Sequence, residues 1–282
     1  MNTSSVVLLG ALTRRCIIQF LFHSHCELLL FGKKNEKKIF EVQMTSISFQ
    51  YHPDIFERFP QLSAGVILAR GMCNDPSSDS LRGAYLSEQL SVLERIGDTP
   101  LSEIPALAAW RGAFRTFGVN PTKYRSAPEA LLRRLTKKGD IPFINTLVDL
   151  NNLVSIRYAL PVATFDVRAL ELPITVHLAS GEERYVTLGE EELKHPEVGE
   201  VIFSDTTGLV VARRWCWRQS QESAAKEDTT DAIFTIEAQH ERGRADTEAA
   251  LRDLLAHLEQ YAGGSVISGM LDRDNLRISF NG

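Results

Sequence analysis

The residues best suited to chemistry in this sequence are basic, and they gather between positions 111 and 138. Eight lysines and arginines fall in that segment against the single acidic residue Glu129, although the formal charge of the 282-residue chain is −5. A local positive surface on an acidic protein can hold a polyanion such as RNA without binding every nucleic acid. Tyr124 lies between two of the basic residues and could stack on an exposed base. The expected RNA-binding residues are Arg111, Arg115, Lys123, Tyr124, Arg125, Arg133, Arg134, Lys137 and Lys138.

Charge alone leaves a second interpretation of this segment open. Long basic side chains on a solvated helix can cover apolar neighbours with their aliphatic stems, and such a surface needs no ligand. On charge alone, this structural interpretation is favoured over RNA binding.

A second group of polar residues follows at helical spacing. Asn145, Asp149 and Asn152 fall at positions i, i+4 and i+7, so a helix would place them on one face. Their neighbours are mostly apolar, which suits burial, and buried polar side chains must find hydrogen-bond partners. Asparagine and aspartate often bond to nearby backbone. These side chains therefore either tie adjacent loops to the helix or form the wall of a binding pocket, and physics alone favours the first.

Several helices must position these two groups. Apolar spacing and terminal signals predict helices over 81–96, 102–117, 126–138 and 247–261. Ser126 and Glu129 form the S-x-x-E pattern of a capping box, with Pro128 in the first turn. Gly118 and Gly139 are expected to end the two basic helices.

Short β-branched runs follow, mostly after residue 170. They predict strands over 62–69, 174–179, 184–188, 200–204, 209–217, 232–237 and 276–280. Helices come first and strands cluster later, which favours an α+β fold over a βαβ array.

One stretch of the sequence is similar to a known family. Residues 144–166, INTLVDLNNLVSIRYALPVATFD, resemble a segment reading roughly IN-x-VVD-x-TNYVMLELGQP-x-HAFD in the B3/B4 domain of bacterial phenylalanyl-tRNA synthetase β subunits. The positions in register are Asn145, Val148, Asp149, Asn152, Pro161, Phe165 and Asp166. Residues 117–135 and 199–218 also resemble that domain, so the resemblance covers roughly 80–235. It implies a mixed sheet packed against helices, binding of tRNA or aminoacyl-tRNA at its 3′ end, and hydrolysis of mischarged aminoacyl-tRNA.

The resemblance also suggests which residues form the site. An editing pocket can hold water near the ester carbonyl and stabilise the developing oxyanion without a nucleophilic triad. The candidates for orienting that water are Asp166, Glu200 and Asp205. The expected substrate-pocket residues are Asn145, Asp149, Asn152, Ala163, Thr164, Phe165, Arg213, Arg214, Trp217, Arg218, Thr229 and Thr230. The arginines among them could meet terminal phosphates or an acidic group.

The sequence departs from the family motif at two places. Ala163 stands where the synthetase segment has a histidine. Residues 213–218 replace the Gly-rich strand on which tyrosine-clearing synthetases carry a glutamate that recognises the phenol. Tyrosine editing is therefore not carried over. Three functions stay open: a trans-acting aminoacyl-tRNA deacylase, a non-catalytic RNA-binding module that kept the fold, and a small-molecule-binding protein. No histidine has a recognisable serine or aspartate context, and no ATP or aminoacylation motif indicates a complete ligase.

Residues 1–43 differ from the rest of the chain. Their apolar runs are interrupted by Arg14, Arg15 and Glu27, so they match neither a signal peptide nor a membrane span. We expect translation to begin at Met44, with 1–43 a disordered or non-native leader; the alternative is a weak interfacial anchor. Residues 44–282 are expected to form a single globular domain that does not associate with membranes.

The four cysteines are scattered, with no Cys/His cluster at metal-ligand spacing. We therefore expect no metal, no other cofactor and no disulfide framework. This cysteine usage favours a reducing, cytoplasmic location.

Overall fold

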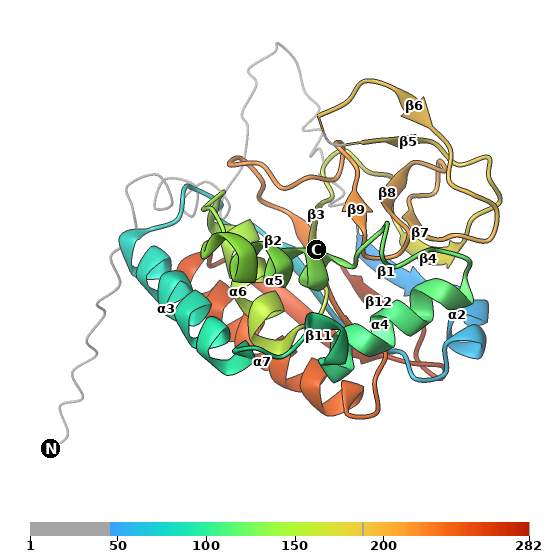
Figure 1. The fold of residues 1–282 in the computed structure, drawn as a ribbon. Helices are drawn as coiled ribbons and strands as arrows, with labels where there is room; N and C mark the ends of the chain where they lie inside the picture. Colours follow the sequence, from blue (N-terminus) through green and yellow to red (C-terminus); the bar gives the residue numbers. More distant parts are fainter. Residues whose placement is uncertain (1–45, 188, 282) are drawn as a thin grey trace, which may run out of the picture. The chain divides into compact units, whose positions relative to one another are not determined.

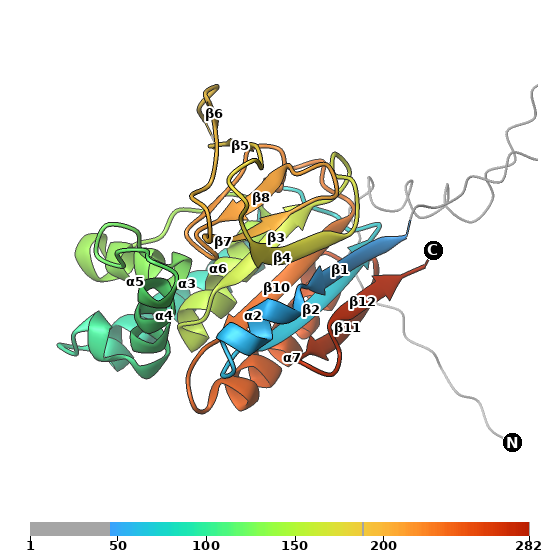
Figure 2. The same cartoon turned by 90° about the vertical axis from the view of Figure 1, so that its right-hand side faces the viewer.

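The computed structural model describes residues 46–187 and 189–281. The expectations for residues 1–43 lie outside this range. In the part of the chain that is described, two sheets pack face to face and helices cover the free face of one of them (Figures 1 and 2). The fold is α+β with sheets packed against helices, as predicted.

The four-stranded sheet is the middle layer. Its strands are all antiparallel to their neighbours. In spatial order they are β11 (Ser265–Leu271), β2 (Ser63–Arg70), β10 (Ala232–Ala238) and β3 (Val162–Asp166). Ile233 of β10 faces the second sheet, whereas Phe234 faces the helices. This burial on both faces explains the unbroken apolar character of β10.

The six-stranded sheet is mixed, because β1 runs parallel to β4 while the other neighbours are antiparallel. In spatial order its strands are β12 (Arg277–Phe280), β1 (Ile47–Tyr51), β4 (Ile174–Leu178), β7 (Val201–Ser204), β8 (Val210–Arg213) and β9 (Arg218–Gln219). A separate two-stranded sheet pairs β5 (Tyr185–Val186) with β6 (Leu193–Lys194). The mixed sheet implied by the family resemblance is confirmed.

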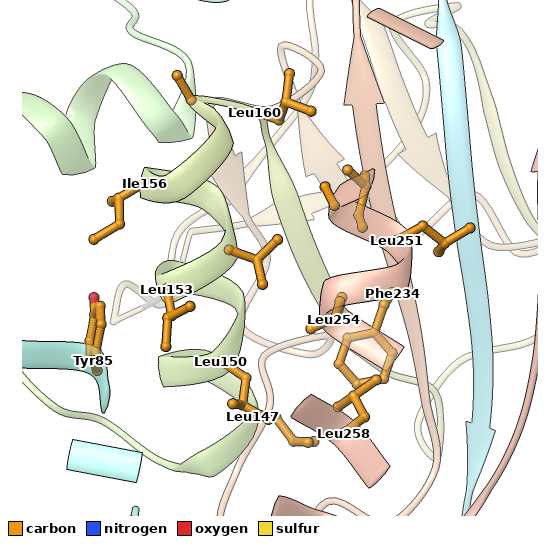
Figure 3. Packing of buried hydrophobic residues seen from close by; sticks show 14 of the residues in the cluster. Tyr85, Leu147, Leu150, Leu153, Ile156, Leu160, Phe234, Leu251, Leu254 and Leu258 are labelled. Carbon is orange, nitrogen blue, oxygen red and sulfur yellow. The ribbon is translucent and has the colours of Figure 1, made fainter. Parts of the chain in front are cut away.

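The helical layer is built from α3 (Asp79–Ile96), α6 (Thr146–Tyr158) and α7 (Gly243–Tyr261). Figure 3 shows the core that they share, with Leu153 of α6 beside Tyr85 of α3, and Leu254 and Leu258 of α7 beside Phe234 of β10. Burial of each large aliphatic side chain stabilises the fold by roughly 1.5–3 kcal/mol. The polar residues of α6 are thus attached to a rigid apolar helix.

The two basic helices are anchored differently. α4 (Pro105–Thr116) buries Trp110 and Phe114 in the core between the sheets, and α5 (Ala127–Lys138) buries Leu132 and Leu135 in the helical core. Two further short elements are α2 (Pro53–Arg58) and the 3₁₀ turn η1 (Leu101–Glu103). Because the apolar faces of α4 and α5 are buried, most of their basic side chains lie on the outside.

Several local predictions are wrong. The predicted strand 209–217 ends at Arg213, and α7 begins at Gly243 rather than at 247. The predicted capping box does not form: Ser126 makes no side-chain cap, and Glu129 accepts from Arg111 Nη1 at 2.7 Å instead. The strands β1 and β11 were not predicted.

Cys216 carries a free thiol, and burial raises its pKa well above the ordinary value.

Candidate nucleic-acid interface

A tight turn at residues 214–217 joins β8 to β9. Arg214 and Trp215 both have a left-handed backbone, with φ of 45° and 60°, which side chains larger than glycine rarely adopt. Two backbone hydrogen bonds hold it: Arg214 N donates to Glu200 Oε1 at 2.8 Å, and Trp215 N donates to Val201 O at 2.7 Å. The chain therefore leaves the strand at Arg213 and turns the Trp215 ring into the core.

Glu200 is the anchor of this turn. Its buried carboxylate accepts from Arg213 Nε at 3.0 Å and from Arg213 Nη2 at 2.9 Å, in addition to the Arg214 backbone. Arg213 is itself buried, so the ion pair is shielded from solvent. Both carboxylate oxygens are engaged, and the role of Glu200 in orienting water stays a prediction.

The Trp215 side chain is held from the other side by Glu237. Trp215 Nε1 donates to Glu237 Oε1 at 2.8 Å, and Tyr51 Oη donates to the same oxygen at 2.7 Å. The Trp215 ring packs on Trp110, with centroids 5.1 Å apart. Burial raises the pKa of Glu237 to about 7, although both hydrogen bonds favour its charged form.

This buried carboxyl makes stability depend on pH. Between about 4.5, the ordinary pKa, and about 7, the folded chain keeps a proton on Glu237 that the unfolded chain has lost. The unfolded state binds fewer protons, so the free energy of unfolding should fall as pH rises through this window. Denaturant unfolding at several pH values measures this slope.

Glu237→Gln, which stays neutral, should flatten the slope across the window, whereas Glu241→Gln on the exposed loop after β10 should not. Equal slopes for the native chain and Glu237→Gln would contradict the prediction.

An aromatic–arginine cluster, formed by Tyr124, Arg214, Trp217 and Arg218, covers the outside of the turn. The Arg214 guanidinium lies 3.9 Å from the Tyr124 ring centroid and 4.7 Å from that of Trp217, while Arg218 lies 4.9 Å from Trp217. The Tyr124 and Trp217 rings meet edge to face at 4.9 Å. A hydrogen bond with Lys123 lowers the pKa of Tyr124. Arg214 is buried against these rings, and its Nε lies 3.7 Å from Glu200 Oε2. The solvent-facing part of the cluster is therefore formed by exposed Arg218 and the half-buried Tyr124 and Trp217 rings.

The cluster is joined directly to α5. Ala127 N, in the first turn of that helix, donates to the Cys216 carbonyl at 2.8 Å. The segment 123–125 is therefore pinned against the turn, which explains how Tyr124 reaches Arg214.

The predicted basic residues fall into two groups. Arg111 and Arg134 are ion-paired, with Glu129 at 2.7 Å and Asp140 at 3.2 Å, and Arg125 lies 3.8 Å from Glu129. In the described part of the chain, the five others are exposed and form no ion pair: Arg115, Lys123, Arg133, Lys137 and Lys138. The unpaired cations are the ones free to meet an anion.

The polar stripe on α6 ties loops to the helix. Asn145 caps α6 by accepting from Val148 N at 3.0 Å, and its amide donates to Ala225 O at 3.2 Å. Asp149 accepts from Ser77 Oγ at 2.6 Å and from Ile144 N at 2.9 Å, and burial raises its pKa. These contacts are those of the structural interpretation, and the part of Asn145, Asp149 and half-buried Asn152 in a pocket stays a prediction.

Asp166 is surrounded by donors at the end of β3. Arg168 donates to it from Nε at 3.0 Å and from Nη2 at 2.7 Å, and Thr229 Oγ1 donates at 2.6 Å. Burial alone would raise the pKa of Asp166, but these hydrogen bonds outweigh it and lower the pKa. Thr229 thereby fastens the loop before β10, and Thr230 accepts from Met72 N at 2.8 Å.

Asp205 organises a turn after β7. Its Oδ1 accepts from Thr207 N at 2.9 Å and from Leu209 N at 3.0 Å, and Oδ2 accepts from Glu171 N at 3.2 Å. The catalytic roles of Asp166 and Asp205 are therefore still predictions, because the observed contacts of both are structural.

The remaining predicted pocket residues lie on β3. Phe165 is fully buried between the sheets, and Ala163 is partly buried against the same core. Thr164 is buried and pairs with Asn151 Nδ2, while Gln219 Nε2 donates to the Thr164 carbonyl at 2.7 Å. Sequence reasoning missed Asn151, whose other amide atom, Oδ1, is buried without a hydrogen-bond partner. Its position beside Asn152 in the family motif was the available signal.

Several histidines have polar partners, and two of them lie beside a serine or aspartate of another element, contrary to the expectation from sequence. His177 Nε2 lies 2.7 Å from Ser204 Oγ, across the adjacent strands β4 and β7. His240 Nε2 lies 2.8 Å from Asp246 Oδ2 at the start of α7. Ser204 could not be identified as the partner of His177 from sequence, because the strands bring together residues 27 positions apart. Asp246 lies only six positions after His240, at the start of α7.

Comparison with known proteins gives the family of the chain. The family model for the B3/4 domain matches residues 109–263, which is more than half of the sequence. The chain belongs to the B3/4 domain family. The matched region of this B3/4 protein contains residues 144–166, together with α5, the turn at 214–217 and α7. The resemblance of residues 144–166 to the B3/B4 domain is therefore confirmed.

Its curated relatives include phenylalanine–tRNA ligase beta subunits. That of Fusobacterium nucleatum is 27% identical over 178 residues and that of Bacillus cereus 28% over 181, covering 55% and 57% of this chain. The B3/4 protein spans only 22% of the length of each. Among solved structures, an N-terminal fragment of the phenylalanyl-tRNA synthetase beta-subunit from Pyrococcus horikoshii aligns over 85% of this chain and 55% of that chain, at 13% identity and a TM-score of 0.42.

Within residues 46–187 and 189–281 of the B3/4 protein, every helix is too short or too polar to span a bilayer. The same residues contain no group of three or more histidine, cysteine or acidic side chains placed to hold a metal ion.

Proposed function

We propose that this B3/4 protein binds tRNA or aminoacyl-tRNA through the aromatic–arginine cluster and the basic residues of α4 and α5. The observation that carries the proposal is the stacking of Arg214 against Tyr124 and Trp217, beside exposed Lys123 and Arg218, which form no ion pair with the residues that the structure describes. Aromatic faces flanked by arginine suit unpaired bases, and unpaired lysines and arginines suit phosphates. Membership of a family found in tRNA ligase subunits supports RNA as the polyanion.

The cluster is better suited to a single-stranded end than to a duplex. Bases in an RNA duplex are stacked on one another, so only unpaired nucleotides can stack on protein rings. The Trp217 ring is half-buried and held by Arg214 and Arg218, which limits the entropy lost when a base stacks on it. The single-stranded 3′ end of tRNA has this chemistry.

Trp217→Ala should weaken tRNA binding by about 1–3 kcal/mol, the usual contribution of one stacked base. Trp217→Phe should recover part of that loss, because a smaller ring still stacks. Dissociation constants from fluorescence anisotropy with labelled tRNA measure both effects.

Two exposed arginines, one inside the cluster and one far from it in sequence, test whether the cluster contributes more to tRNA binding than general positive charge does. Arg218→Ala should weaken tRNA binding, whereas Arg273→Ala, in the β11–β12 turn, should not. Equal losses of tRNA affinity in the two variants would mean that Arg218 contributes no more than any other surface cation.

The second candidate function is hydrolysis of mischarged aminoacyl-tRNA in trans. One observation favours it: among the described residues, Asn151 Oδ1, beside Thr164, is buried and has no hydrogen-bond partner, so a water held there could donate to it. A panel of cognate and mischarged aminoacyl-tRNAs tests this function by ester release over time. Release faster than in buffer supports the deacylase, and tight binding without release assigns the non-catalytic module. A cytoplasmic location follows from either function, since tRNA charging takes place there.

A further inference from the structure

A surface cavity of about 400 Å³ lies between α5, the loop 97–102 and the neighbouring part of α4. Such a volume is in the range of small-ligand sites. The cavity is polar and basic: its lining includes Arg111, Arg125, Arg133 and Lys137, together with Glu129 and Asp98. None of these residues belongs to the aromatic–arginine cluster.

The charges in the cavity are unevenly paired. Four basic side chains stand against two carboxylates, which leaves a net charge of +2. Glu129 holds Arg111 at 2.7 Å and lies 3.8 Å from Arg125, so the inner cations are fixed in place. Arg111 Nη2 also donates to Thr122 Oγ1 at 3.2 Å. Arg133 and Lys137, one helical turn apart on α5, have no acidic partner among the described residues and repel one another in the absence of an anion.

The cavity and the aromatic–arginine cluster lie on two sides of one short segment. Thr122 and Arg125 line the cavity, whereas Tyr124, between them, stacks on Arg214. A ligand that places a base on the cluster therefore brings its neighbouring phosphates close to the cavity.

We propose that this cavity binds the 5′-terminal phosphate of the tRNA, while the aromatic–arginine cluster holds the unpaired 3′ end; the proposal rests on the tRNA-binding function proposed above. A terminal phosphomonoester carries about −1.5 to −2 charges at neutral pH, which matches the net charge of the cavity. A chain end can enter a concave site, whereas an internal phosphodiester must continue along an open groove. Fixed arginines suit phosphate oxygens because their donors form a planar fork. In tRNA the 5′ phosphate and the single-stranded 3′ end leave the same helix end.

The test compares one tRNA with a 5′ phosphate and with a 5′ hydroxyl, bound to the full chain. Removing the phosphate should weaken binding about tenfold, the effect of losing one charge-assisted contact of roughly 1.4 kcal/mol. The double variant Arg133→Ala/Lys137→Ala should bind both forms equally. The control is Arg134→Ala/Lys138→Ala, which removes two charges from the same helix at residues that do not line the cavity, one of them paired with Asp140. It should keep the tenfold difference between the two tRNA forms, although both forms bind more weakly. All four substituted side chains are exposed, and a thermal melt checks that each variant is folded.

The outcomes separate this inference from the proposed function. If the native chain binds both tRNA forms equally, the phosphate site is overturned while tRNA binding stands. If Arg133→Ala/Lys137→Ala keeps the tenfold difference, the phosphate is not in this cavity. If neither form binds, both proposals fail. If free AMP competes with tRNA at concentrations similar to those at which tRNA binds, the cavity is a site for a free nucleotide. That result would overturn the assignment of the cavity to the RNA end.

Discussion

Replacing Glu200 by alanine is expected to lower the free energy of unfolding by about 3–5 kcal/mol, the usual cost of removing one partner of a buried ion pair. Arg213 would keep its charge in the core without a counter-ion, and the Arg214 amide would lose its acceptor. The left-handed backbone of Arg214 and Trp215 would then keep only one of the two backbone hydrogen bonds that hold it, that from Trp215 N to Val201 O. Denaturant unfolding measures the loss in stability.

Glu197→Ala is the control for this substitution, because Glu197 is exposed and lies three residues away on the same loop. It should change stability by less than about 0.5 kcal/mol. Glu200→Ala should also weaken tRNA binding under conditions where the variant is folded, since the turn carries Arg214 and Trp217. Near-native stability of Glu200→Ala would mean that the ion pair does not anchor the turn.

Replacing Arg133, Arg134, Lys137 and Lys138 together with alanine should weaken tRNA binding on the order of 100-fold at moderate salt. Each phosphate contact contributes roughly one unit to the slope of log affinity against log salt concentration. If about three of the four side chains contact phosphates, the slope should fall by about three units. Binding titrations over a series of salt concentrations give the slope directly.

The control variant removes the same number of positive charges from another part of the surface. Arg242, Arg244, Arg252 and Arg273 are basic residues on or near α7 and β11, and their joint replacement removes the same formal charge. That variant should keep most of the salt slope. If the salt slope is unchanged in the α5 variant, the basic segment is a solvated helix surface and does not bind RNA phosphates.

The sequence predicted well those features that depend on neighbours along the chain. The helix α5 is one case, because Pro128 near its start, apolar residues at helical spacing and Gly139 at its end are all local signals. Gly139 adopts the expected left-handed backbone, with φ of 82°. Family resemblance located the polar residues of α6, but their hydrogen bonds are those of a cap and of loop anchors.

The turn at 214–217 was not predictable in the same way. The run from 209 to 217 is rich in residues that favour strands, and nothing near it in sequence indicates a reversal. The reversal depends on Glu200 and on the burial of Trp215 against Trp110, and these are contacts across the fold. Glu237 was likewise read only as the end of a strand, since its partners Tyr51 and Trp215 come from other elements.

The arrangement of the three tryptophans provides an optical reporter within the native chain. Trp110 and Trp215 are fully buried beside one another, while Trp217 is half-buried in the aromatic–arginine cluster. A quencher dissolved in water therefore reaches Trp217 far more readily than the other two, and a stacked nucleobase would shield it. Ligand occupancy can thus be followed by intrinsic fluorescence without a label, and the emission of the buried pair serves as an internal standard for the integrity of the core.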